Sequence, residues 1–128
     1  MFAFRTDEQK RLVCMAISGI LSVEEADRLT AELVANASTA RRRFGSFRFL
    51  VDARESLVQP TATMSRFKSP DEVLEGPDDR YAIVLGSMLS KMQTDRLTSD
   101  DRMKSFLSVD SAEAWLSAQA VTHGTTTQ

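Results

Sequence analysis

The sequence predicts a single α/β domain with a five-stranded, mostly parallel sheet, an antiparallel N-terminal strand and about four helices, in the order ββαβαβαβα. Its 128 residues are the size of one domain. Short apolar runs alternate with segments of helical periodicity, and only the first two apolar runs are adjacent. Strands that alternate with helices are joined by right-handed crossovers, so they form a parallel sheet that is covered by helices. We expect the domain to span residues 1–120, with 121–128 as a disordered polar tail.

The first half of the chain begins with a predicted hairpin followed by a long helix. Phe2 and Phe4 alternate with smaller or polar neighbours, and residues 12–17 form a nearly continuous apolar run. Ser22 and Glu25 have the spacing of a capping box, which predicts the start of a helix. An apolar stripe on one face extends this helix to about residue 40 and consists of Ala26, Leu29, Leu33 and Ala37.

The second half contains three further strands. Residues 47–51 (FRFLV) predict a short buried strand that ends at Asp52, and Pro60 is placed to start a helix. A further helical turn is expected near Pro70, before Gly76 and Pro77. Residues 81–85 and 103–107 predict the last two strands, with a helix between them. Ser108 can cap a final helix, whose apolar face contains Ala112, Trp115, Leu116 and Ala120, with Trp115 as a core anchor.

Composition favours a soluble protein without a cofactor or metal. The 16 basic and 18 acidic residues are mixed along the chain, so no overall field favours nucleic acid or an anionic membrane. The apolar runs VCMAI and AIVL are far too short to span a membrane, and the start lacks a signal sequence, so we expect a cytoplasmic protein. Cys14 is expected to be a buried, inert thiol. His123, the single histidine, lies in the predicted tail, so we expect no catalytic residue built on it.

Several charged or glycine-containing segments have ordinary structural interpretations. Residues 41–43 are three arginines at the end of a helix, where the helix dipole favours cations. Together with Arg48 they could instead contact phosphates, and this alternative predicts weak, salt-dependent DNA binding. The acidic pairs at 78–79 and 100–101 fit turns. Gly86 and Ser87 follow an apolar run, but one glycine does not make a phosphate-binding loop, so we expect a tight turn with a serine cap.

Three segments carry a resemblance to a known family. The segments ISGILSVEEADRL, RYAIVLGSMLSKMQTDRL and KSFLSVDSAEAWL resemble the SpoIIAA-like or STAS-like family, which is related in fold to anti-sigma factor antagonists and to Sec14-type lipid-binding domains. With the element order, the resemblance covers roughly residues 2–120. It implies a regulatory or ligand-binding module. In the antagonists a serine in an Asp-Ser-Ser-Gly-like turn is phosphorylated; here the strand is followed by VDARESLVQP, where Ser56 is the nearest serine and the glycine is missing.

We therefore expect a non-enzymatic regulatory or protein-interaction module of the SpoIIAA/STAS type. Ligands of parallel sheets collect at the carboxyl ends of the strands. Asp52, Arg54 and Ser56 would share the loop after the strand at 47–51, and they form the polar cluster that we predict to bind a protein partner.

The alternative function is a small-molecule or lipid carrier with an apolar pocket between two helices. The pocket wall would consist of Met64, Phe67, Met88 and Met92. The same residues could simply be core, and exposed apolar surface on the methionine-rich helices could also support a homodimer. An enzyme is the third class, which would require a convergent polar cluster.

Overall fold

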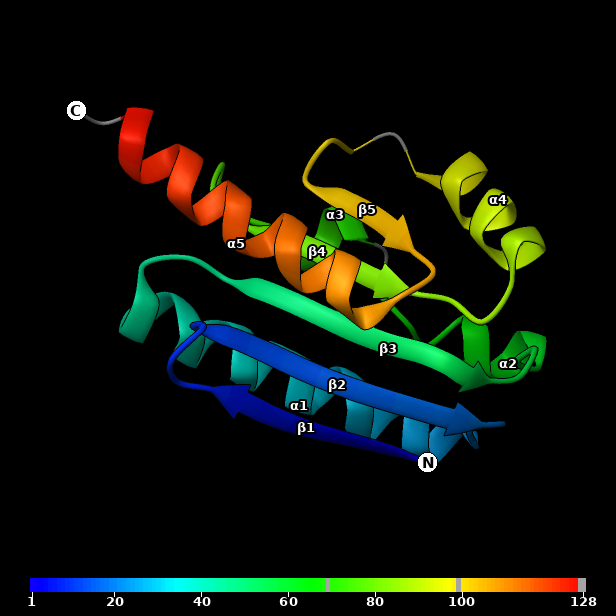
Figure 1. The fold of residues 1–128 in the computed structure, drawn as a ribbon. Coiled ribbons are helices and arrows are strands. Elements are labelled where there is room, and N and C mark those ends of the chain that lie inside the picture. Colours follow the sequence, from blue (N-terminus) through cyan, green and yellow to red (C-terminus); the bar gives the residue numbers. More distant parts are fainter. Residues whose placement is uncertain (69, 99, 127–128) are drawn as a thin grey trace.

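A five-stranded mixed sheet forms the centre of the computed structural model, which describes residues 1–68, 70–98 and 100–126, without the side chains of 70, 71 and 119–126. The strands lie in chain order, with β1 antiparallel to β2 and all later pairs parallel (Figure 1). This confirms the predicted fold class and element order. The strands are β1 (Phe2–Asp7), β2 (Leu12–Gly19), β3 (Arg48–Ser56), β4 (Arg80–Val84) and β5 (Met103–Phe106).

Helices cover both faces of the sheet. The long α1 lies behind the sheet in Figure 1, and α5 lies across its front over β3, β4 and β5. Two one-turn helices, α2 and α3, lie between β3 and β4, where the sequence predicted a helix from Pro60 and a further helical turn near Pro70. The helices are α1 (Val23–Phe44), α2 (Thr61–Met64), α3 (Pro70–Val73), α4 (Met88–Leu97) and α5 (Val109–Thr126).

The predicted helix starts are confirmed by their caps. Ser22 Oγ accepts a hydrogen bond from the Glu25 N–H at 3.1 Å while the Glu25 carboxylate accepts one from the Ser22 N–H, which completes the capping box. Ser87 and Ser108 cap α4 and α5 in the same way, each at 3.1 Å. Helix α1 continues past residue 40 until Gly45, whose φ of 85° is the left-handed conformation that ends many helices.

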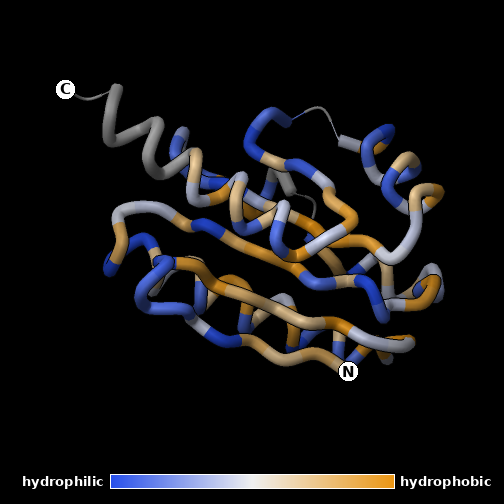
Figure 2. The backbone as a smooth tube through the Cα atoms, in the orientation of Figure 1, coloured by the Kyte–Doolittle hydropathy of each residue, from blue (hydrophilic) through white to orange (hydrophobic). Residues whose placement is uncertain are grey.

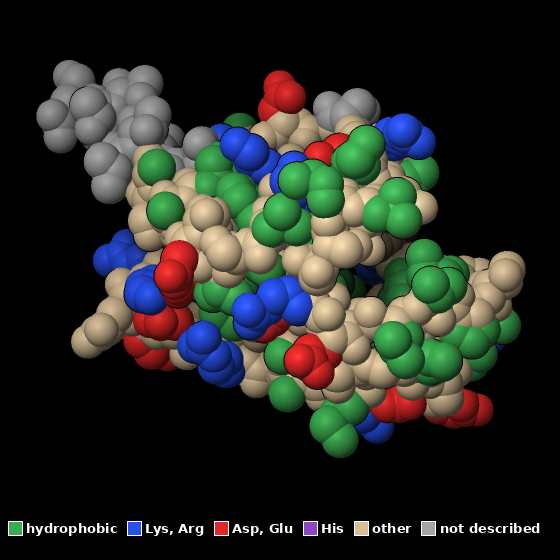
Figure 3. Space-filling model, turned by 45° about the vertical axis from the view of Figure 1, so that its right-hand side comes forward, with side chains coloured by type: hydrophobic (Ala, Val, Ile, Leu, Met, Phe, Trp, Pro, Cys, Tyr) green, Lys and Arg blue, Asp and Glu red, His purple; other side chains and the backbone are tan. Residues whose placement is uncertain are grey.

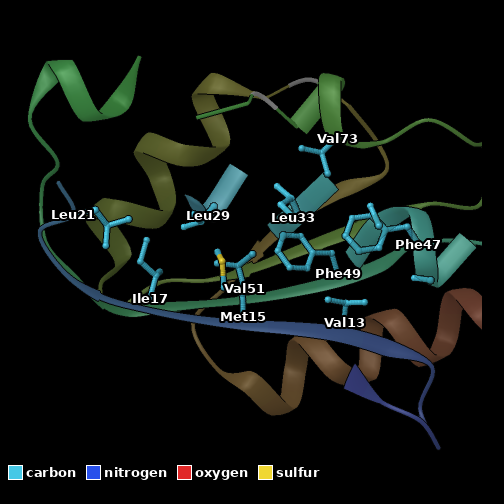
Figure 4. Close-up of a cluster of buried hydrophobic side chains, with 12 residues drawn as sticks. Val13, Met15, Ile17, Leu21, Leu29, Leu33, Phe47, Phe49, Val51 and Val73 are labelled. Carbon is cyan, nitrogen blue, oxygen red and sulfur yellow. The ribbon is translucent and has the colours of Figure 1, made fainter. Parts of the chain in front are cut away.

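The larger hydrophobic core lies between α1 and the sheet (Figure 4). Phe49 is fully buried at its centre, with its ring centroid 5.1 Å from that of Phe47 and 5.2 Å from that of Tyr81. Leu29 and Leu33 from α1 face the aromatic side chains and the aliphatic residues of β2 and β3. The core therefore joins the hairpin, α1 and the central strands into one unit.

A smaller core lies between α5 and the other face of the sheet. Ala112 and Leu116 are fully buried there, and Cys14 is buried beside them, as predicted. Burial raises the pKa of the Cys14 thiol, which keeps it protonated and unreactive. Trp115 contacts the sheet, as predicted, with its ring 5.8 Å from Phe106, but it is only partly buried and lies at the margin of this core. The indole lies at the margin because the face of α5 centred on Ala112 and Leu116 points at the sheet.

Helix α5 continues past residue 120 to Thr126. Within the predicted tail of residues 121–128, residues 127–128 and the side chain of His123 lie outside the described residues. The tail therefore stays a prediction.

The arginines at the end of α1 do not form one exposed basic patch. The Arg41 side chain is mostly buried and forms an ion pair with Asp79 at 2.8 Å, whereas Arg43 pairs with Glu8 on the surface. Arg48 is also buried and donates a hydrogen bond to the Leu116 carbonyl at 3.2 Å. Arg41 is therefore held by an internal ion pair, because it lies beside the chain that leads into β4.

Candidate functional site

The carboxyl ends of β2, β3, β4 and β5 meet at one edge of the sheet, where α1, α2, α4 and α5 begin. Large apolar side chains are exposed along this edge, and Figure 2 shows apolar chain segments at its turns. Figure 3 shows hydrophobic side chains gathered on the side that carries α2 and α4, above and below a hollowed region. We call this surface the apolar edge; it consists of Ile20, Leu57, Val58, Met64, Met88, Leu89, Met92 and Leu107.

Asp52 and Arg54 lie on the last part of β3 rather than in a loop, which corrects the sequence prediction. Two Arg54 nitrogens donate to the Asp52 carboxylate at 2.8 and 2.9 Å, and the Arg54 backbone N–H donates at 3.2 Å. These bonds, led by those from the guanidinium, lower the pKa of Asp52 below its ordinary value. The strand continues because Ser56 still pairs with Gly19 on β2, beyond a register shift next to Ala16.

Ser56 belongs to a different set of contacts from Asp52 and Arg54. Its hydroxyl accepts a hydrogen bond at 3.2 Å from the side chain of Gln59. The same amide group donates to the carbonyls of Gly19 and Leu57, both at 2.9 Å, and its oxygen accepts from the Leu21 N–H at 2.8 Å. Gln59 thus joins the loop after β2 to the loop after β3. No local pattern points to Gln59, because Gly19 and Leu21, its partners in the loop after β2, are 40 and 38 residues away in the sequence.

Gly86 lies where the turn after β4 comes closest to β3. A Cβ atom at this position would be 2.8 Å from the Arg54 carbonyl oxygen, which is shorter than van der Waals contact. Glycine is therefore required by close backbone approach. The turn carries the Ser87 cap, as predicted, and so places the start of α4 beside the end of β3.

We expect Gly86→Ala to lower the free energy of unfolding by about 1–3 kcal/mol, since the backbone at Arg54 or Gly86 has to move. Urea denaturation followed by circular dichroism measures this change. Gly76→Ala is the matched control, because its Cβ would meet nothing closer than 3.7 Å. Equal stabilities of the two variants would contradict the close approach.

The residues of the predicted apolar pocket are not core, except for Phe67. Met64, Met88 and Met92 are 53%, 57% and 48% exposed, whereas Phe67 is partly buried against the larger core. The three methionines belong to the apolar edge. Two hollows in the described part of the chain lie elsewhere: one of about 390 Å³ between α4, β5 and Trp115, and one of about 500 Å³ between α1 and α3. A pocket walled by Met64, Phe67, Met88 and Met92 stays a prediction.

Two further findings concern metals and membranes. Among the described residues, no three His, Cys, Asp or Glu side chains are grouped closely enough to hold a metal ion. In the same residues, no helix combines the length and hydropathy needed to cross a bilayer.

Comparison with known proteins identifies the fold. No family model matches the sequence, and neither does any curated protein. The chain is similar to the crystal structure of an uncharacterized protein from Shewanella loihica PV-4, of the DUF3478 family with a SpoIIAA-like fold. The identity is 17%, the TM-score is 0.63, and the match covers 91% of this chain and 92% of that chain. We conclude that this chain has a SpoIIAA-like fold, as the resemblance of its three segments predicted.

Proposed function

We propose that this chain is a non-enzymatic protein-interaction module of the STAS type, which binds a partner protein at the apolar edge. The observation that carries this proposal is the gathering of exposed apolar side chains at one edge of the sheet. A gathering of exposed apolar side chains at one edge is typical of interaction sites, whereas isolated exposed residues are not. Among the residues whose side chains the structure describes, Val34 and Leu97 are the two other exposed large apolar residues beyond the first methionine, and both lie away from this edge.

Helix α4 supports the proposal because its apolar residues remain uncovered. None of its ten residues is buried, although Met88, Leu89 and Met92 lie on its first turns. Most of the stability of short helices in proteins comes from packing an apolar face against another surface. A partner that covers this face would both gain binding energy and stabilise α4.

The polar groups beside the apolar edge also favour binding over catalysis. The Asp52 carboxylate is held by three hydrogen bonds from Arg54, and its pKa is lowered. A carboxylate that stays ionised and paired is poorly suited to take up and release protons near neutral pH. The Asp52–Arg54 pair instead fixes the shape of the end of β3.

The test is affinity capture of partner proteins from a lysate of the source organism, with variants of the apolar edge. Leu89→Gln on α4 and Val58→Ser before α2 remove apolar contacts from highly exposed positions without disturbing the core. We expect each to reduce the affinity of a captured partner by about tenfold, the typical effect of an important interface residue.

Leu97→Gln is the matched control, because Leu97 is an exposed leucine of the same helix, outside the apolar edge. It should capture the same proteins as the wild type. Equal capture by all variants would contradict the proposal. A native mass spectrum with an excess mass that disappears on denaturation would instead support the carrier, with Met64, Phe67, Met88 and Met92 as its wall.

A further inference from the structure

We infer that the segment bound at the apolar edge is an amphipathic helix with basic residues beside its apolar face. This inference rests on the proposed function, because it names the partner of the same surface. It follows from the charges around the apolar edge and from the elements that form it.

The rim of the apolar edge is acidic. Glu24 lies in the first turn of α1, Glu55 lies next to the last residue of β3, and Asp110 lies in the first turn of α5, so all three lie at the carboxyl edge of the sheet. All three residues are exposed. Among the described residues, none of the three forms an ion pair.

Three of the neighbouring cations are already engaged. Arg54, Arg66 and Lys91 flank the apolar edge along the chain, and each forms an ion pair. The distances are 2.8 Å to Asp52, 3.7 Å to Asp27 and 2.9 Å to Asp95, respectively. Lys104 on β5 is a further exposed cation, but the three carboxylates outnumber it, so the charge that remains for a partner is negative.

Complementary charges steer association and select partners, and like charges placed across an interface are costly. A partner with lysine or arginine beside its apolar contacts would match the acidic rim. A second copy of this chain would bring another acidic rim to the contact, and an anionic bilayer would bring more negative charge. Both are therefore disfavoured by the same three carboxylates, Glu24, Glu55 and Asp110.

The elements of the apolar edge favour a helix as the bound segment. This edge is built from turns and helix starts, whereas the outermost strands β1 and β5 run along the other sides of the sheet. Strand addition, which needs unpaired backbone, is not available at the turns. Met64 on α2 and Met88 and Met92 on α4 are exposed at this edge, and flexible methionine side chains suit the apolar face of a helix.

The test uses two designed amphipathic peptides with the same leucine face, one with lysine and one with glutamate on the polar face. Fluorescence anisotropy measures their binding to the purified chain. We expect the basic peptide to bind at least about tenfold more tightly at low salt, and this preference to decrease at high salt. The triple variant Glu24→Gln, Glu55→Gln, Asp110→Asn should lose the preference, while Leu89→Gln should weaken the binding of the basic peptide.

The outcomes separate this inference from the proposed function. If the basic and the acidic peptide bind the wild type equally, and Leu89→Gln weakens the binding of both, the apolar edge is an interaction site but the inference of a basic partner is wrong. Absence of binding by the basic peptide would also overturn the inference. So would a dimer in sedimentation equilibrium that Leu89→Gln converts to a monomer, or cosedimentation with phosphatidylserine vesicles that this variant abolishes. Thermal melts that match the wild type would show that the variants are folded.

Discussion

Replacement of Phe49 by alanine is expected to lower the free energy of unfolding by about 3–5 kcal/mol. Phe49 is fully buried, and its ring stacks near Phe47 and meets the edge of Tyr81 at 5.2 Å. Alanine would leave a cavity in the middle of an aromatic cluster whose members come from three strands. The surrounding rings belong to strands that are held in register by the sheet, so they can fill the cavity only in part.

Chemical denaturation of wild type and variant measures the loss. Leu97→Ala is the control, because this side chain is 88% exposed and its truncation should change the stability by no more than about 0.5 kcal/mol. Phe49→Leu should fall between the two, since it keeps most of the apolar contacts. A cost of Phe49→Ala similar to that of Leu97→Ala would show that Phe49 is not at the centre of the core.

Local sequence signals were enough to predict the order of the elements. The capping box of Ser22 and Glu25 and the stripe through Leu29 and Leu33 are short-range features, and each one corresponds to an observed contact. The alternation of apolar runs with helical periods then selects the parallel topology, because right-handed crossovers leave few alternatives.

The end of β3 was not predicted because it depends on pairing rather than on composition. The apolar pattern stops at Val51, and the following residues, which include Asp52 and Arg54, look like a loop. In the structure, β2 supplies the hydrogen bonds that keep these residues extended, through the pairs of Glu55 and Ser56. Strand length at this point is a property of two segments, which a single apolar run does not reveal.

Helical periodicity also could not predict that the methionines are exposed. Helical spacing shows that Met88 and Met92 share a face of α4, but it does not show whether this face meets the sheet or solvent. The core interpretation assumed that an apolar helix face is buried within its own chain. The apolar edge depends on the topology of the sheet, which brings Leu57 after β3 and Leu107 after β5 to the edge where α4 begins.

Asp79→Ala is expected to lower the free energy of unfolding by about 3–5 kcal/mol, the usual effect of removing one partner from a buried ion pair. The Asp79 side chain is almost completely buried and accepts hydrogen bonds from the N–H groups of Phe47, Glu75 and Gly76 at 2.8–3.1 Å. It also pairs with Arg41. Alanine would leave these donors without an acceptor, and the segment before β4 would lose its ion pair between Asp79 and Arg41 of α1. Thermal and urea unfolding measure the loss, with exposed Asp101→Ala as the control.

The same carboxylate predicts a loss of stability in acid. Burial raises the pKa of Asp79, but the backbone N–H groups and Arg41 outweigh burial, so its pKa in the folded protein lies below the ordinary value. An unfolded aspartate has a pKa of about 3.9, so the stabilisation is fully present above that pH and is lost as the pH falls through the folded pKa. Asp79→Asn, which keeps the shape but does not ionise, should be less stable than the wild type at pH 7, and the difference should shrink below about pH 4. Parallel stability profiles for the two proteins from pH 7 to pH 2 would contradict this origin of the stability.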